Sequence, residues 1–315
     1  MADPQFSILS KRFFLFLGLG VGVFLGLSFY GNWGAVSGAF KQFSYWTLPL
    51  ILALAFMNYL SRFWRWELYL KQVKIPLPRK ESFYIFMSGL VMTVTPGKMG
   101  ELLKSYLLKE SRQVPLSLSG PIVLAERFTD LLAVYLLTLL GCISFAYGAG
   151  ILILGLVVLL AGLLPFIFPE LFQGLLGLAK RFSWGQRFER PLSEAFYTLH
   201  DLMGLRLLLL ASILGMGAWF FECLAFQMVF KGLGVEVPLV KAVFIYAFST
   251  LAGALSMLPG GIGAAEGSMT SLLVLIQLPK ALATTATIII RVCTIWFAVL
   301  LGYGFLKLYQ KQKRL

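Results

Sequence analysis

The stretch "TVTPGKMGELLKSYLL", residues 93–108, follows a short apolar run and decides how we expect the chain to fold. The run before it, residues 82–95, would reach only about 21 Å at 1.5 Å per helical residue, whereas a bilayer core is about 30 Å thick. Pro96, Gly97 and Gly100 are poor residues for the interior of a helix. The stretch therefore predicts a half-helix that bends at Pro96-Gly97 and turns back; the alternative is a helix that ends there and enters a cytoplasmic loop.

The composition indicates an all-α integral membrane protein. Of 315 residues, 59% are hydrophobic and 13% are charged, against about 45–50% and about 25% in soluble domains. A crossing needs roughly 20 apolar residues. Six segments meet that requirement, so we expect about six transmembrane helices at residues 12–30, 46–66, 117–147, 150–168, 206–230 and 281–306.

A second stretch, "LSMLPGGIGAAEGSMTSLLVL" at residues 255–275, repeats the first pattern of Pro-Gly, a further Gly and then a Glu. The match extends downstream, because Arg127 follows Pro115 by twelve residues and Arg291 follows Pro279 by twelve. Two copies predict two opposed re-entrant hairpins in an inverted-topology repeat. The predicted units are 46–147 with hairpin 82–110 and 206–306 with hairpin 242–278.

The distribution of basic residues predicts the orientation. With a cytoplasmic N-terminus, 21 of the 27 Lys and Arg residues fall on the cytoplasmic side and only Lys41, Lys231, Lys241 and Lys280 fall outside. Such a bias is the positive-inside pattern, and it accounts for the net charge of +13 without nucleic acid. We expect one transmembrane domain, 1–315, in the cytoplasmic (inner) membrane, multi-pass, with both termini cytoplasmic and an amphipathic cytoplasmic connector at 169–205.

The bends suggest where an anion would bind. A half-helix that begins at such a bend presents N–H groups and a positive dipole end. Candidate substrate-binding residues at the two bends are Gly97, Lys98, Gly100, Gly260, Gly261 and Gly263. Lys98 and Lys104 have a second interpretation as interfacial anchors, and Arg62 and Arg65 are expected to snorkel towards the cytoplasmic surface.

Arg127 and Arg291 lie about ten residues inside predicted crossings. A charge at that depth is costly and indicates a function, and a guanidinium suits bidentate contact with phosphate. Both are therefore substrate-binding candidates. The alternative is structural pairing, of Arg127 with Glu126 or Asp130 and of Arg291 with Glu266 or Glu101.

Several carboxylates have two interpretations. Glu101 and Glu266 follow their bends, so they either cap the half-helices or bind a headgroup or proton. Glu222, within a crossing, is a candidate for proton or ion coupling or for a local hydrogen bond. Glu126 and Asp130 are further coupling candidates if they are not simply partners of Arg127.

Other site types find little support. His200 is the only histidine, which excludes a two-histidine metal site. Cys142, Cys223 and Cys293 lie in apolar segments and indicate neither disulfides nor a zinc site. "GGIGAAEG" has no βαβ frame around it, so it is not a dinucleotide motif. We expect no metal, no cofactor and no catalytic residue.

The paired motifs "TPGKMGELLKSYLL" with "ERFTDLLAVYLL" and "LPGGIGAAEGSMTSLL" resemble the transmembrane region of lysylphosphatidylglycerol synthases and its stand-alone flippase-like relatives. The similarity covers roughly residues 10 to 310. It implies an inner-membrane protein that moves or handles a lipid with an anionic or aminoacylated headgroup, and for some relatives a polyprenyl-phosphate or glycolipid carrier. The sequence ends at "YQKQKRL" without the soluble aminoacyl-transfer domain of full-length synthases, so we expect no synthase activity.

Three functions follow as hypotheses. The first is a lipid transporter or flippase for an anionic or phosphate-bearing lipid, whose partner is that lipid. The second is a membrane-embedded transferase or hydrolase acting on a lipid headgroup, for which Glu101 with Glu266 is the one plausible acid–base pair. The third is a non-transporting membrane partner of a lipid-modifying enzyme.

Overall fold

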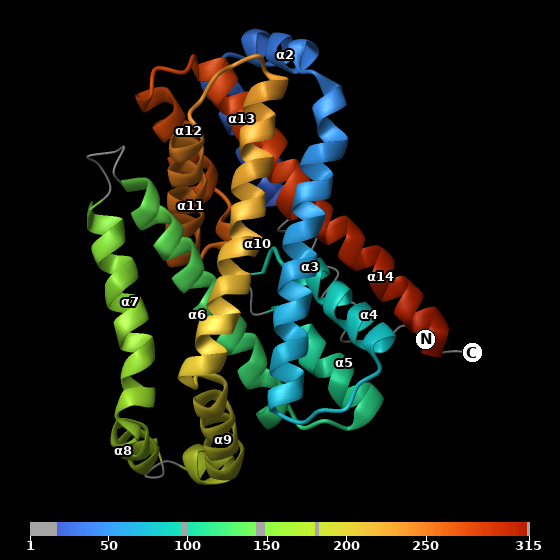
Figure 1. Cartoon of the computed structure of the whole chain (residues 1–315), viewed down its shortest axis with the longest axis vertical. Coiled ribbons are helices and arrows are strands. Elements are labelled where there is room, and N and C mark those ends of the chain that lie inside the picture. The colour runs from blue at the N-terminus through green and yellow to red at the C-terminus, as the bar shows by residue number, and fades with distance from the viewer. Residues whose placement is uncertain (1–17, 96–99, 143–148, 180–182, 314–315) are drawn as a thin grey trace.

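The structure is a computed structural model that describes residues 18–95, 100–142, 149–179 and 183–313. Within these ranges the chain forms helices and no strand. An N-terminal helix, Gly18–Tyr30, is followed by α2 (Trp33–Gln42), α3 (Leu48–Gln72), α4 (Arg79–Gly89), α5 (Leu103–Arg112), α6 (Leu116–Gly141), α7 (Ala149–Ile167), α8 (Pro169–Ala179), α9 (Ser183–Leu202), α10 (Leu205–Gly232), α11 (Leu239–Leu255), α12 (Ala264–Leu275), α13 (Lys280–Arg291) and α14 (Phe297–Lys313) (Figure 1).

The described helices are those of a membrane protein. The helix Leu205–Gly232 and the continuous helical run Lys280–Lys313 are long and apolar enough to cross a bilayer. Two further pairs, Gly18–Tyr30 with Trp33–Gln42 and Gly150–Phe166 with Pro169–Leu178, reach that length only as bent pairs. Length and composition thus give two to four spans in the described part of the chain, fewer than the six predicted.

The difference arises in α3 and α6, which are both long but carry several charged residues. Figure 1 shows α3 and α10 side by side and running in opposite directions. Asn58 Nδ2 of α3 donates a hydrogen bond to the Ala218 carbonyl of α10 at 2.9 Å, and both residues are buried. Arg62 and Arg65 of α3 are buried as well. These three polar side chains therefore face protein, and a test based on apolar composition does not identify such a helix as a membrane span.

The two predicted units share local backbone features. Two helices in each unit have a proline as N-cap. In the first unit these are Pro78 before α4 and Pro115 before α6, and in the second unit they are Pro238 before α11 and Pro279 before α13. A residue with positive φ lies a few positions before each proline: Lys74 (55°) before Pro78, Gln113 (57°) before Pro115, Gly234 (67°) before Pro238 and Gln277 (70°) before Pro279. Left-handed residues commonly end helices, so the same stop-and-start pattern occurs at matching places in both units.

The second hairpin consists of α11, a glycine-rich bend and α12. Gly260 and Gly261 have φ values of 60° and 67°, a region that is unfavourable for residues with a Cβ atom. A Cβ atom added at Gly261 would lie 2.9 Å from Gly253 Cα, so the bend is packed directly against the helix it leaves. Glycine at both positions is what lets the chain turn back here.

The first hairpin consists of α4 and α5, and its bend at residues 96–99 lies outside the described residues. Just before that bend, Val94 packs in one hydrophobic cluster with Ile262, Ile295 and Val299. A Cβ atom added at Gly260 would lie 3.3 Å from Val94 Cγ1. The approaches to the two bends therefore meet, although the predicted proximity of Pro96 to Pro259 involves a residue outside the described part.

The connector predicted at 169–205 contains two helices, α8 and α9. Phe172 of α8 stacks on Phe196 of α9 with ring centroids 3.8 Å apart. Helix α9 also packs against α6. The cytoplasmic placement of this connector and the domain boundaries around it remain predictions.

Candidate functional site

A cavity of about 350 Å³ lies between the two predicted units. Its walls come from α3, α6 and α7 on one side and from α10, α11 and the α13–α14 region on the other. The charged residues that line it are Arg62, Arg127, Asp130, Glu222 and Arg291. Both arginines predicted from the Pro-to-Arg spacing thus line the same cavity.

Arg127 contacts two carboxylates. Its Nη2 atom donates to Glu101 Oε2 at 3.0 Å and lies 3.1 Å from Asp130 Oδ2, one helical turn along α6. The pairing with Asp130 is the structural alternative considered from the sequence. Its buried Nε has no hydrogen-bond partner among the described residues, and 17% of the side chain is exposed. Arg127 is therefore paired but keeps donor capacity at the cavity.

Arg291 ties the second hairpin to the helix that follows it. Its Nε donates to Glu266 Oε1 at 2.6 Å, and its Nη2 donates to the Gly260 carbonyl at 2.8 Å. A π-helical turn, Val292–Trp296, begins directly after Arg291. Such widened turns recur at functional sites, and this one separates α13 from α14 beside the cavity.

Glu101 and Glu266 occupy matching places but have different surroundings. Glu266 Oε2 accepts a hydrogen bond from the Gly263 N–H at 2.7 Å, so Glu266 caps α12. This capping role is one of the two interpretations given for it from the sequence. Glu101 is buried among three cations, with Arg62 and Arg127 as hydrogen-bond donors and Lys104 at 3.5 Å. Both glutamates lie behind the arginines, since neither is among the residues that line the cavity.

The backbone N–H groups of the second bend are engaged within the protein. Gly261 N donates to Leu258 O at 2.9 Å, and Ile262 N donates to Pro259 O at 3.0 Å. The Gly263 N–H is bound to Glu266, as described above. Gly260 and Gly261 do line the cavity, but the N–H groups of Gly261, Ile262 and Gly263 are not available to an anion without rearrangement.

The other residues predicted to bind substrate at the two bends are Gly97, Lys98, Gly100 and Gly263, and none of them belongs to the described lining of the cavity. Gly97 and Lys98 lie outside the described residues. Gly100 N donates to Thr95 Oγ1 at 2.7 Å, which fixes the chain directly after the first bend.

Arg62 and Arg65 do not snorkel, which corrects the sequence-based expectation. Their exposed fractions are 4% and 0%. Arg62 Nη2 donates to Glu101 Oε1 at 3.3 Å, and Arg65 Nη2 donates to Asp130 Oδ1 at 2.6 Å. Helix α3 continues to Gln72, so both arginines lie well before its end. The sequence pattern that could have predicted their burial is the spacing of Asn58, Arg62, Arg65 and Tyr69, which places all four side chains on one face of the helix.

Lys104 is not an interfacial anchor, a second correction. Its side chain is 1% exposed and forms an ion pair and hydrogen bond with Glu126. Its Nζ atom also lies 4.8 Å from the ring centroid of Trp66, a cation–π distance. Glu126, predicted as a coupling candidate, is therefore neutralised by a buried lysine away from the cavity lining.

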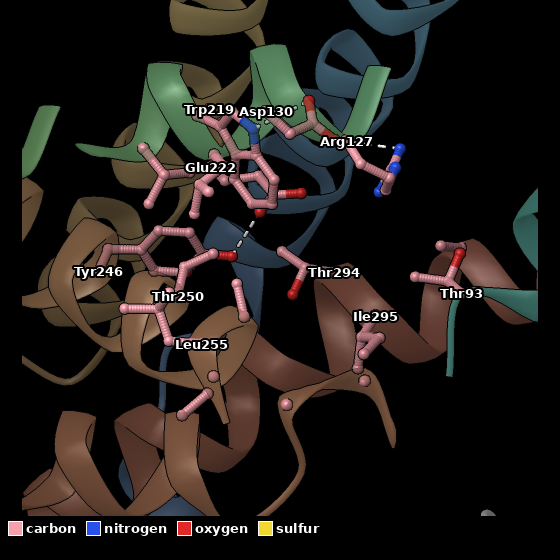
Figure 2. A pocket seen from close by; sticks show the side chains of 18 of the residues that line it. Thr93, Arg127, Asp130, Trp219, Glu222, Tyr246, Thr250, Leu255, Thr294 and Ile295 are labelled. Carbon is pink, nitrogen blue, oxygen red and sulfur yellow. Dashed lines mark hydrogen bonds and ion pairs between the residues drawn. The ribbon is translucent and has the colours of Figure 1, made fainter. Parts of the chain in front are cut away.

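A polar and aromatic group lines the cavity at Glu222. Tyr246 Oη donates to Glu222 Oε2 at 2.5 Å, and Trp219 Nε1 donates to Asp130 Oδ1 at 3.3 Å. Tyr59 Oη donates to the Thr294 carbonyl at 2.6 Å. Figure 2 shows the Glu222–Tyr246 pair on one side of the cavity and the Arg127 side chain on the other.

The cavity also has a largely apolar portion. This portion is lined by side chains from α6, α7, the end of α11 and the segment after it: Leu131, Val134, Val158, Leu255, Met257 and Leu258. Met257 is 64% exposed and Leu258 is 44% exposed. The lining thus combines arginines with apolar side chains, two of which are exposed at the surface of the molecule.

Comparisons with known proteins find relatives that are named membrane proteins. The chain is 23% identical to a UPF0104 membrane protein of Methanothermobacter thermautotrophicus over 94% of this chain and 93% of the relative. A UPF0104 membrane protein of Methanocaldococcus jannaschii is 27% identical over 69% of this chain and 92% of the relative. A shorter match to a Methanothermobacter protein, 36% identical, spans 31% of this chain and 29% of that relative.

No solved structure matches the chain significantly. The family model of the lysylphosphatidylglycerol synthase TM region matches residues 15–302. This match includes both Pro-Gly motifs and both arginines, and it confirms the resemblance drawn from those motifs. The chain belongs to the lysylphosphatidylglycerol synthase TM region family.

Proposed function

We propose that this protein transports a lipid with a phosphate-bearing headgroup across the cytoplasmic membrane by alternating access. One observation carries the proposal: three arginines, Arg62, Arg127 and Arg291, line the same cavity as a group of apolar side chains. A lipid has that same division into an anionic head and apolar tails. A soluble anion would have no use for the apolar part.

The arginines supply the chemistry for the headgroup. Guanidinium groups bind phosphate in a planar, bidentate manner. The buried Nε atoms of Arg62 and Arg127 have no hydrogen-bond partner among the described residues, and an unsatisfied buried donor costs about 1–3 kcal/mol. A phosphate that draws these side chains into new hydrogen bonds would recover part of that cost, which favours binding of an anion.

The apolar surface supplies a place for the tails. Leu131 and Val134 of α6, Val158 of α7 and Leu255 of α11 all line this part of the cavity. Because Met257 and Leu258 are exposed beside it, tails that leave along this route would enter the bilayer directly. The headgroup would then cross through the polar part while the tails remain in lipid.

The repeat supplies a way to alternate. In the proposed topology six crossings and two opposed hairpins form inverted halves, 46–147 and 206–306, with both termini cytoplasmic. The parallel Glu101–Arg127 and Glu266–Arg291 pairs and the contact between the approaches to the two bends support this arrangement. Inverted halves that rock about a central site expose it to each side in turn. The chain has no nucleotide-binding motif, so an ion gradient, downhill flow or a partner would drive the process.

The enzymatic alternative is less well supported by the geometry. Its acid–base pair, Glu101 with Glu266, would have to reach the substrate, yet each carboxylate is bound to arginine and neither is part of the described cavity lining. A scaffold role would not require a lined cavity at all.

Lipid bound to the purified protein tests the proposal. The protein would be purified in mild detergent and its lipids measured by mass spectrometry. We expect one class of phosphate-bearing lipid to be enriched over its share of the membrane, and the enrichment to be lost in Arg127→Gln. Arg112→Gln is the matched control, because Arg112 pairs with Glu81 at the surface, away from the cavity. Lipids in bulk proportions in all three proteins would contradict it.

A further inference from the structure

The helical run Lys280–Lys313 joins the two hairpins. Its first part, α13, is held to the second hairpin, because Arg291 donates hydrogen bonds to Glu266 of α12 and to the Gly260 carbonyl in the bend. Its last part, α14, packs along α4 of the first hairpin, as Figure 1 shows. Any change in the position of one hairpin relative to the other therefore acts on this run of helix.

The contact between α14 and the first hairpin is backbone to backbone at Gly302. A Cβ atom added there would lie 2.2 Å from Val91 N and 2.8 Å from the Leu90 carbonyl carbon. Further along α14, the ring of Phe305 packs edge to face against Phe83 of α4, with ring centroids 5.4 Å apart. Closely packed surfaces transmit displacement rather than absorb it. We therefore expect α14 to move with the first hairpin and α13 to move with the second.

A π-helical turn, Val292–Trp296, lies between these two attachments. The Phe297 N–H is shared between the carbonyls of Val292 and Thr294, and Thr294 Oγ1 donates to the Ile290 carbonyl at 2.8 Å. A π-turn interrupts the regular ladder of helical hydrogen bonds, and a threonine that bonds back to the preceding turn often bends a helix. The run is therefore easiest to bend between its two attachments.

The π-helical turn also forms part of the cavity wall. Thr294 and Ile295 line the cavity (Figure 2). Ile295 also belongs to the hydrophobic cluster in which the approaches to the two bends meet, together with Val94 and Ile262. Bending at the turn would therefore change the cavity wall and the contact between the hairpins at the same time.

We infer that the π-helical turn Val292–Trp296 is the hinge of the transport cycle, an inference that rests on the proposed function. When the hairpins part, α13 stays with the second hairpin and α14 stays with the first, and the run bends between them. Because the turn lines the lipid site, the same bend reshapes that site as it opens to the other side of the membrane.

Helix α6 provides an internal reference for this motion. It carries Arg127 into the same cavity, but it is α-helical throughout Leu116–Gly141. Between Leu124 and Leu140, all of which the structure describes, α6 has neither a π-turn nor a proline. We therefore expect this part of α6 to keep its length while the α13–α14 run bends.

Deletion of one residue tests the inference. Cys293 lies in the turn, is buried and is not part of the described cavity lining. A π-turn holds one residue more than the α-helix around it, so deletion of Cys293 should restore a regular ladder while both attachments keep their register. We expect the deletion variant to bind dihexanoyl phosphatidylglycerol as the wild type does, but to move fluorescent phosphatidylglycerol between leaflets no faster than in protein-free vesicles. Cys293→Ala keeps the residue count, is the matched control and should move lipid at the wild-type rate.

Distances within the intact chain test the inference without a deletion. In a background whose native cysteines are replaced by alanine, spin labels would be attached to Lys280→Cys and Lys311→Cys. Both positions are exposed and lie about 46 Å apart along an unbent helix. A labelled pair at the exposed positions Leu124 and Leu140 of α6 is the control. When dihexanoyl phosphatidylglycerol is added, we expect pulsed EPR to show a second, shorter 280–311 distance and an unchanged 124–140 distance.

The outcomes separate the inference from the proposed function. Lipid movement at the wild-type rate by the folded deletion variant, or a single 280–311 distance with and without lipid, would overturn the hinge and leave lipid transport standing. Loss of movement in Cys293→Ala would assign the effect to the side chain and overturn the hinge as well. If the deletion variant does not fold, the distances alone decide. A wild type that does not move lipid would overturn the proposed function and the hinge with it.

Discussion

Arg291 Nε donates a hydrogen bond to Glu266 Oε1 at 2.6 Å, and both side chains are buried. Through this pair, α13 holds the start of α12, which Glu266 also caps. Removal of one member of a buried ion pair typically costs about 3–5 kcal/mol, whereas replacement of both by apolar or neutral residues of similar volume is often harmless. The pair therefore allows the stability of the fold to be separated from the function of the cavity.

We predict that Arg291→Met lowers the thermal unfolding midpoint strongly and that adding Glu266→Gln restores most of the loss. The double variant should nevertheless fail to bind phosphate-bearing lipid, because the cavity has lost a guanidinium. Arg291→Lys should bind weakly, since a point charge lacks the planar fork. Thermal unfolding in detergent and lipid binding on the same samples measure both effects. Full binding by the folded double variant would assign Arg291 to structure alone.

Arg65, which pairs with Asp130, should contribute to stability only. Arg65 is 0% exposed, lies 2.6 Å from Asp130, and is not part of the described cavity lining. Arg65→Met should therefore destabilise the protein by about 3–5 kcal/mol, because it leaves Asp130 with one cation fewer. Arg112→Met, which breaks an exposed pair, should cost less than about 1 kcal/mol. Equal midpoints for the two variants in thermal unfolding would contradict the buried role.

The proposed topology predicts which positions face each side of the membrane. In a background without Cys142, Cys223 and Cys293, single cysteines would replace the exposed residues Lys41, Lys71 and Lys280. An impermeant maleimide added to intact cells should label positions 41 and 280, while position 71 should react only after the membrane is opened. Labelling of position 71 from outside would reject the orientation, and with it the positive-inside assignment.

Alternating access predicts that the two hairpins separate during transport. A Cβ atom at Gly260 would lie 3.3 Å from Val94 Cγ1, so a disulfide between Val94→Cys and Gly260→Cys is within reach. Oxidation should stop lipid movement and reduction should restore it. The two single variants control for strain at Gly260, where φ is 60°. Unchanged transport by fully cross-linked protein would show that the bends do not part.

Much of the fold was predictable because its signals are local. The Pro-Gly bends and the twelve-residue Pro-to-Arg spacing predicted the helix pairs α4 with α5 and α11 with α12, and they singled out Arg127 and Arg291. The first crossing was less predictable: the helix Gly18–Tyr30 is followed by a bend of 100° into α2. Asn32, at the start of α2, has a φ of 68° and caps that helix, a turn that the apolar run before it does not reveal.

The cavity was less predictable because its contacts are distant in sequence. Arg65 meets Asp130 across 65 residues, and Lys104 meets Glu126 across 22. Hydropathy treats a charge near a predicted helix end as a surface residue, whereas here the helices continue and the charges neutralise one another inside. The cluster could be identified only once α3, α5 and α6 were placed side by side.

Transbilayer movement of lipid tests the central claim most directly. The protein would be reconstituted into vesicles that carry fluorescent phosphatidylglycerol or another phosphate-bearing lipid enriched in the purified protein, and movement would be followed by quenching of the outer leaflet. We predict movement by the wild type and by Arg112→Met, and none by Arg291→Met with Glu266→Gln. Movement no faster than in protein-free vesicles, or wild-type movement by the double variant, would contradict transport through the arginine-lined cavity.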